Sequence, residues 1–326
     1  MRRLLLVPAL MAMLLTGCGT SPADDSELPL VVATTSIWGD VARQIVGDDA
    51  RVEVLIPIGA DAHDYEPTQQ QVALLLEADL VIANGLGLEE GLVDILESAA
   101  ADGANIFEVA PELDPIEFGR DHEKADHDHD NEDADHDDHD RDHVHDHDHG
   151  DLDPHVWFDP IRMGRGAGLI AERLTEVAPE VDWSERAQSY VLSLQELDQE
   201  IEDILGDVPE ERRRIVTNHE ALGYFADRYH FDVIGVVIPG GSTLADPSSA
   251  QLARLVDAMD EGGVSTIFTE TSQPSRLAEA VAAEVGEDVA VVALYTESLG
   301  EPGSDAGTLT GMLRANARAI ADALSG

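Results

Sequence analysis

From Leu30 to the end of the chain, short apolar runs alternate with longer segments whose apolar positions recur every three or four residues. The first runs are LVVATTS, RVEVLI, DLVIANG and NIFEVA, and helical segments follow Ser36, open at Pro67 and run through LEEGLVDILESAA. Short β-branched runs bounded by turn residues indicate strands, and their alternation with helices favours a parallel sheet covered by helices. The first part of the chain is therefore predicted to form one βα lobe.

A second alternating set occupies the C-terminal part of the chain. Its apolar runs are RRIVTNH, DVIGVVI, STIFTE and DVAVVAL, and its helices are predicted through ALGYFADRY and over residues 247–259, 274–285 and 309–324. Between the two sets, a helix is predicted over residues 160–177, and residues 183–205 then keep an apolar stripe over about six helical turns. The pattern predicts an α/β fold in which two βα lobes with parallel sheets are joined by one long helix.

The N-terminus resembles the signal of a bacterial lipoprotein. Two arginines follow Met1, residues 4–15 form an apolar run too short to span a bilayer, and Leu15-Thr16-Gly17 precede Cys18. Small residues before a lone cysteine resemble a lipobox, so we expect Cys18 to become the lipid-bearing first residue of the mature protein. An ordinary signal peptide with a free thiol is the alternative. Because Cys18 is the only cysteine, we expect the mature protein to have no disulfide and its metal site to use no thiolate ligand.

The predicted organisation is a signal peptide over residues 1–18, a tether over 19–29, an N-terminal lobe over 30–182, a linking helix over 183–207 and a C-terminal lobe over 208–326. The formal charge of −48 argues against nucleic acid as a partner and favours cations. No second apolar run approaches the roughly twenty residues of a spanning helix, so we expect a soluble folded part held to the membrane by Cys18 alone.

One segment of the N-terminal lobe, residues 121–149, holds fourteen acidic residues and nine of the thirteen histidines. It has too few apolar residues to build a core, so it is predicted to be a disordered loop. Imidazole and carboxylate at this density are typical of weak auxiliary metal sites, and an acidic linker with incidental histidines is the alternative. The histidines are His122, His127, His129, His136, His139, His143, His145, His147 and His149.

Four histidines remain outside this segment. His63, His155 and His219 each follow a predicted strand or lie in a loop between elements, and Glu297 follows the last predicted strand. Ligands bind at the carboxyl edge of open α/β sheets, and three imidazoles with one carboxylate satisfy the tetrahedral preference of zinc. His230, between a helix and a strand, is interpreted as a cation at a helix C-terminus and not as a ligand.

At these residues the chain resembles the substrate-binding lipoproteins of zinc and manganese ABC importers, the cluster A-I (cluster 9) metal-binding solute receptors. The resemblance covers nearly the whole mature chain. It rests on GADAHDYEPTQQQVALLLEADLVIANGLGLEEGL, DPHVWFDP, TNHEALGYFADRY, FTETSQPS and ALYTESLG, in this order and at similar spacing. The resemblance implies two lobes bridged by a rigid helix with the metal between them, and the histidine-rich loop is typical of the zinc branch.

The resemblance also implies metal ligands at His63, His155, His219 and Glu297. Manganese receptors usually have a carboxylate at the third position, so His219 favours zinc, because imidazole is the softer ligand. The family commonly has Asp at the position of Glu297. The longer side chain leaves three possibilities open there: a bidentate carboxylate, a longer reach, or a position freed for water.

The expected function is an extracytoplasmic receptor that captures Zn²⁺ between two lobes and delivers it to an ABC permease driven by its ATPase, as a monomer and not as an enzyme. The loop would either concentrate zinc or sense it. A manganese or iron receptor is the nearer alternative, and a zinc hydrolase or a metal-binding adhesin are more distant ones. Zinc affinity is expected to fall below about pH 6.5, where free imidazole becomes protonated.

Overall fold

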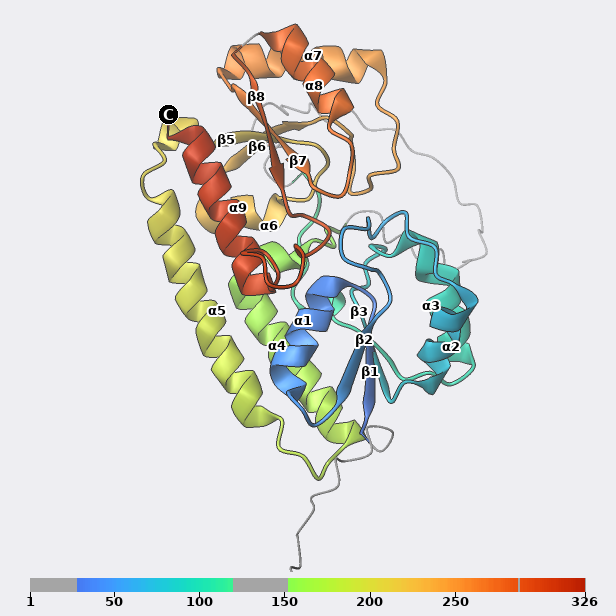
Figure 1. Ribbon diagram of the computed structural model, residues 1–326. Helices are drawn as coiled ribbons and strands as arrows, with labels where there is room; N and C mark the ends of the chain where they lie inside the picture. The colour runs from blue at the N-terminus through green and yellow to red at the C-terminus, as the bar shows by residue number, and fades with distance from the viewer. Residues whose placement is uncertain (1–27, 120–151, 287, 326) are drawn as a thin grey trace, which may run out of the picture.

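The computed structural model describes residues 28–119, 152–286 and 288–325 (Figure 1). The predicted signal peptide, Cys18, most of the tether and the histidine-rich segment 121–149 with its nine histidines lie outside these residues. The described residues form two lobes, each built on a four-stranded parallel sheet, with one long helix beside both. The predicted fold class is confirmed.

The N-terminal sheet has the strand order β2-β1-β3-β4. The central strands β1 and β3 are buried along their whole length, which explains their unbroken apolar sequences, whereas the edge strand β2 alternates exposed and half-buried residues. Helices α1 and α4 cover one face of the sheet, and α2 and α3 lie on the other side (Figure 1). The elements are β1 (Leu30–Ala33), α1 (Ser36–Val46), β2 (Arg51–Val54), α2 (Gln69–Glu77), β3 (Leu80–Ala83), α3 (Val93–Ala101), β4 (Ile106–Glu108) and α4 (Pro160–Val177).

The C-terminal sheet repeats this arrangement with the order β6-β5-β7-β8. Helices α7 and α8 pack on its outer face, where Val237, Met259 and Ile267 belong to a separate apolar cluster. Helices α6 and α9 lie on the side of the sheet that faces the rest of the molecule (Figure 1). The elements are β5 (Arg214–Thr217), α6 (Gly223–Tyr229), β6 (Asp232–Val236), α7 (Ser249–Gly262), β7 (Thr266–Glu270), α8 (Arg276–Val285), β8 (Ala290–Leu294) and α9 (Leu309–Leu324).

Helix α5 (Ser184–Leu205) runs along one side of both lobes and packs against α4, α1 and α9. Buried Asp198 of α5 accepts a hydrogen bond of 2.7 Å from Arg228 Nε and one of 3.1 Å from the Tyr229 hydroxyl, which holds α6 against α5. Helix α9 is last in sequence but touches α1 of the N-terminal lobe, where the Leu309 N–H donates to Asp40 at 2.9 Å. The lobes are therefore tied together along this side by a shared core.

Most predicted elements are present, and the differences have local causes. The predicted helix through LEEGLVDILESAA begins with a 3₁₀ turn (Glu90–Leu92) before α3. A Cβ at Gly91 would lie 2.4 Å from the Tyr65 carbonyl oxygen, so this close approach requires glycine. Helix α2 begins after Pro67, where Thr68 and Gln71 form a capping box. None of the helices in the described ranges has the length and apolar character needed to cross a membrane.

Candidate metal centre

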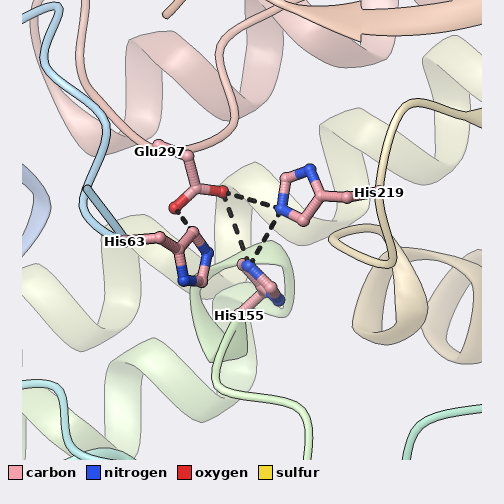
Figure 2. Close-up of side chains that lie close together, drawn as sticks. All are labelled: His63, His155, His219 and Glu297. Atoms are coloured by element: carbon pink, nitrogen blue, oxygen red, sulfur yellow. Dashed lines mark hydrogen bonds and ion pairs between the residues drawn. The ribbon is translucent and has the colours of Figure 1, made fainter. Parts of the chain in front are cut away.

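Four side chains from separate loops meet at the boundary between the lobes (Figure 2). His63 comes from the loop after β2, His219 from the loop after β5 and Glu297 from the loop after β8. His155 follows no strand: it directly precedes a 3₁₀ turn (Val156–Phe158) that leads into α4. The expectation that these residues share one site rests on strand ends for three of them, and the structure brings all four together.

The inward-facing atoms lie close together: one ligand atom from each of the four residues lies within 4.8 Å of the others, and three of them have near-tetrahedral spacing. Glu297 Oε1 lies 3.3 Å from His219 Nε2 and 3.5 Å from His155 Nε2, and the two Nε2 atoms lie 3.3 Å apart. Glu297 Oε2 lies 3.7 Å from His63 Nε2. Around a tetrahedral zinc ion with bonds of about 2.0–2.1 Å, neighbouring ligand atoms are about 3.3 Å apart. The four groups thus surround a space of the size of one such ion.

Burial makes this cluster costly without a cation. Each of the four residues is at most 2% exposed. In the described part of the chain, neither Glu297 oxygen accepts a well-oriented hydrogen bond, and neither ring nitrogen of His63 has a hydrogen-bond partner. Buried polar groups, and carboxylates above all, are normally satisfied by donors or by metal ions. The chemistry of the donor set therefore fits a divalent cation.

Two of the imidazoles are held from outside by a second carboxylate. His155 Nδ1 lies 2.7 Å from Asp153 Oδ1, and His219 Nδ1 hydrogen-bonds to Glu270 Oε1. Such carboxylate–histidine pairs fix the ring and turn its other nitrogen toward a metal. His63 is held less firmly, because Glu90 Oε1 lies 3.3 Å from its Nδ1 without hydrogen-bond geometry.

The charges of the site perturb its titration. Burial opposes protonation of His219, but its hydrogen bond with Glu270 and the attraction of the Glu270 and Glu297 carboxylates raise its pKa to about 10. Burial would raise the pKa of Glu297, yet the surrounding histidines, His155 foremost, leave it below its ordinary value. Burial lowers the pKa of His155 well below its ordinary value. These shifts favour the protonated form of His219, which lies between two carboxylates, in the metal-free protein.

The outer carboxylates Asp153, Glu270 and Glu90 were not among the residues singled out in the sequence. Asp153 could have been recognised from its place two residues before His155, and Glu270 from its place at the end of STIFTE. His230 lies apart from the site: it is exposed and caps the C-terminus of α6 in a left-handed conformation with φ of 59°. Its position at a helix end agrees with the interpretation of the sequence.

A cavity of about 250 Å³ leads from the surface to His63. Its titratable lining groups within the described residues are His63 and Glu90, and Phe118, Gly241 and Ser242 complete one side. His63 lowers the pKa of the half-exposed Glu90, which keeps a negative charge at the entrance. The cavity gives cations a route to the outer edge of the His63 ring.

A protein-family model described as zinc-uptake complex component A, periplasmic, matches residues 31–323. The manganese-binding lipoprotein MntA of Halalkalibacterium halodurans is 30% identical, over 96% of this chain and 95% of that protein. The zinc-binding protein TroA of Treponema pallidum is 28% identical, over 94% of this chain and 92% of that protein.

Solved structures give the same picture. The structure of periplasmic zinc-binding TroA from Treponema pallidum superposes with a TM-score of 0.76 and 28% identity, covering 92% of this chain and all of that one (100%). The structure of a ZnuA deletion mutant with zinc bound has a TM-score of 0.71 and 26% identity, over 92% of this chain and 99% of that one.

Proposed function

This chain belongs to the family of periplasmic zinc-uptake complex component A proteins, and from this premise we propose that it captures Zn²⁺ with His63, His155, His219 and Glu297. It is a metal-binding receptor of an ABC-type importer, as its relatives are named, and it works with a permease and an ATPase. The observation that carries the zinc assignment is the convergence of three buried imidazoles and one carboxylate, with one ligand atom of each within 4.8 Å of the others.

Zinc is favoured over manganese by the chemistry of the donors. Imidazole suits zinc, whereas manganese prefers oxygen ligands and a larger coordination number. The candidate site offers three nitrogens and one carboxylate, and its outer carboxylates Asp153 and Glu270 accept from ring nitrogens instead of facing the centre. Manganese is the alternative cargo, because two similar proteins are named manganese-binding lipoproteins.

Capture in this proposal needs little rearrangement of the firmly held ligands. Asp153 and Glu270 fix the rings of His155 and His219 before the ion arrives, so little side-chain entropy is lost on binding. Glu297 directs both carboxylate oxygens toward imidazoles. Its side chain, which is one methylene longer than the Asp common in the family, reaches the centre of the site. Because α5 and α9 bind the lobes together along one side, we expect release by small loop and lobe shifts.

A hydrolase would need an open coordination position for water. Here the Glu297 carboxylate faces the three histidine rings and occupies the fourth ligand position, and the site is buried. This geometry supports a receptor that encloses its cargo. The proposal also includes a monomeric state, lipidation at Cys18 and weak zinc sites in segment 121–149. Cys18 and this segment lie outside the described residues.

Zinc stoichiometry tests the proposal directly. Deleting residues 121–149 should leave a protein that binds one zinc ion tightly, because the four proposed ligands lie outside the deletion. The full chain should bind further ions more weakly, since ordering flexible ligands costs entropy. Elemental analysis and calorimetry measure both numbers, and equilibrium dialysis against equal zinc and manganese should recover zinc.

Two results would contradict this assignment. If the loop-deleted protein binds no zinc tightly, then His63, His155, His219 and Glu297 do not form the tight zinc site. Preferential recovery of manganese in the dialysis would leave the receptor function intact and change its cargo.

Binding should release about one proton per zinc ion near pH 7.5, because the pKa of about 10 keeps His219 protonated in the metal-free protein. Raising the pH toward that pKa removes the competing proton, so affinity should rise by about tenfold per pH unit up to about pH 10. The structure thus extends the expected pH dependence well above the ordinary histidine range. Calorimetry in buffers of different ionisation enthalpy measures the proton count.

Matched variants identify the source of the proton. His219→Gln should bring the count close to zero, because the amide carries no proton that must leave. His155→Gln should leave it near one, because burial keeps His155 neutral already. Equal counts in the wild type and in His219→Gln would show that the proton comes from elsewhere.

A further inference from the structure

Two of the proposed zinc ligands are preceded by the same local structure. In both Asp61-Ala62-His63 and Asp153-Pro154-His155, the aspartate Oδ1 accepts a 2.9 Å hydrogen bond from the backbone N–H of the histidine. The turns differ in their further contacts. Asp153 Oδ1 also lies 2.7 Å from the ring nitrogen Nδ1 of His155. Asp61 instead directs its Oδ2 across the boundary to the C-terminal lobe.

Asp61 joins two loops of that lobe to the His63 loop. Its Oδ2 accepts a 2.6 Å hydrogen bond from the Thr243 hydroxyl, in the loop after β6, and another from Gln273 Nε2, in the loop after β7. The Asp61 side chain is only 8% exposed. A buried carboxylate that accepts three hydrogen bonds is well satisfied in this arrangement and poorly satisfied once the lobes part.

The Thr243 loop is closely fitted to the N-terminal lobe. A Cβ added at Gly241 would lie 1.9 Å from the Phe118 ring, so the ring rests directly on the Gly241 backbone. The preceding Gly240 has φ of 95°, a conformation that other residues avoid. Ser242 lines the cavity that leads to His63. The loop thus forms one wall of the access route and contacts Asp61 beside it.

His63 is the ligand that depends most on this arrangement. His155 and His219 each have a carboxylate hydrogen-bonded to Nδ1, whereas neither ring nitrogen of His63 has a hydrogen-bond partner in the described part of the chain. The position of the His63 ring is therefore set mainly by its backbone. That backbone is fixed by the same Asp61 carboxylate that holds Thr243 and Gln273.

We propose that Asp61 is a positioning residue that couples lobe closure to metal retention. While its bonds to Thr243 and Gln273 are intact, His63 stays in the site; when they break, His63 withdraws first and the ion remains on His155, His219 and Glu297. This inference rests on the proposed function, because it takes these four residues as the ligands. In this proposal, zinc release begins with the movement of the His63 loop and is controlled by the Asp61 carboxylate.

The dissociation rate of zinc tests the coupling. The full chain is loaded with one equivalent of zinc and mixed with excess fluorescent chelator in a stopped-flow instrument. Asp61→Asn keeps an oxygen for the His63 N–H but loses the charged acceptor for Gln273. Thr243→Val combined with Gln273→Leu breaks the same contacts from the other lobe. Asp64→Asn, at an exposed position of the same loop, is the matched control for lost charge.

Both sets of variants should release zinc faster, on the order of tenfold, with association rates near the wild-type value. Combining them should add little, because they remove the same contacts. Asp64→Asn should release zinc at the wild-type rate. Release at the wild-type rate from both Asp61→Asn and the Thr243→Val, Gln273→Leu variant, or fully additive effects of the two, would overturn the coupling. A wild-type protein without tight zinc would instead refute the proposed function, so the two failures are distinguishable.

Discussion

Replacing His155 with alanine is expected to weaken zinc binding by about two to three powers of ten. Structural zinc sites gain about 10–16 kcal/mol from their ligands, which is about 2.5–4 kcal/mol for each of four. His155 is fully buried, and its Nε2 lies within 3.5 Å of both His219 Nε2 and Glu297 Oε1. No described neighbour can replace this nitrogen, because the nearby Asp153 contacts the opposite side of the ring.

The loss should be accompanied by a less stable metal-free fold. Without the imidazole, the buried carboxylates of Asp153 and Glu297 lose a polar neighbour, and a cavity remains. His230→Asn is the matched control, because His230 is exposed and asparagine tolerates its left-handed conformation. Competition titration against a chelator measures the affinity and thermal unfolding the stability. Wild-type affinity in His155→Ala would exclude this residue as a ligand.

The sequence predicted the architecture well because the pattern of each strand reports its burial. LVVA and LVIA are unbroken apolar runs since β1 and β3 are central strands covered on both faces, and RVEV alternates because β2 is an edge strand. Helix starts were less exact. They depend on caps such as Thr68, and on close contacts such as that of Gly91 with the Tyr65 carbonyl, which periodicity does not record.

The sequence indicated which four residues form the candidate site, but not the outer contacts that hold them in place. His63, His219 and Glu297 follow strands, so the parallel topology predicts that they approach one edge. His155 follows no strand, and its place in the site depends on the path of the loop before α4. Contacts made by Glu270 to His219, and by Asp61 to Thr243, depend on rotamers and on the angle between lobes, which a single sequence does not encode in any local pattern.

Replacing His219 with glutamate and Glu270 with glutamine is expected to shift the cargo from zinc toward manganese. His219→Glu alone would set a new carboxylate against Glu270, which now hydrogen-bonds to the ring. Combining it with Glu270→Gln keeps the number of carboxylates in the cluster unchanged and supplies an amide that can donate to the new carboxylate. The site would then offer two imidazoles and two carboxylates, a harder donor set.

The double variant should bind zinc about a hundredfold more weakly while manganese binding falls less or improves, because oxygen donors suit manganese. Parallel competition titrations with both metals give the ratio of the two affinities. Glu270→Gln alone is the control: it should weaken zinc by about 10–100-fold, as outer-shell changes do, without raising the relative affinity for manganese.

An unchanged ratio in the double variant would show that the donor type at His219 does not set the preference. Selectivity would then have to come from how far the buried site restricts the coordination number, since four groups that converge this closely favour a small coordination shell. Glu297→Asp would separate these explanations. Shortening the one carboxylate that faces the three imidazoles enlarges the space without altering the donor types, so a gain in manganese affinity there would identify size as the determinant.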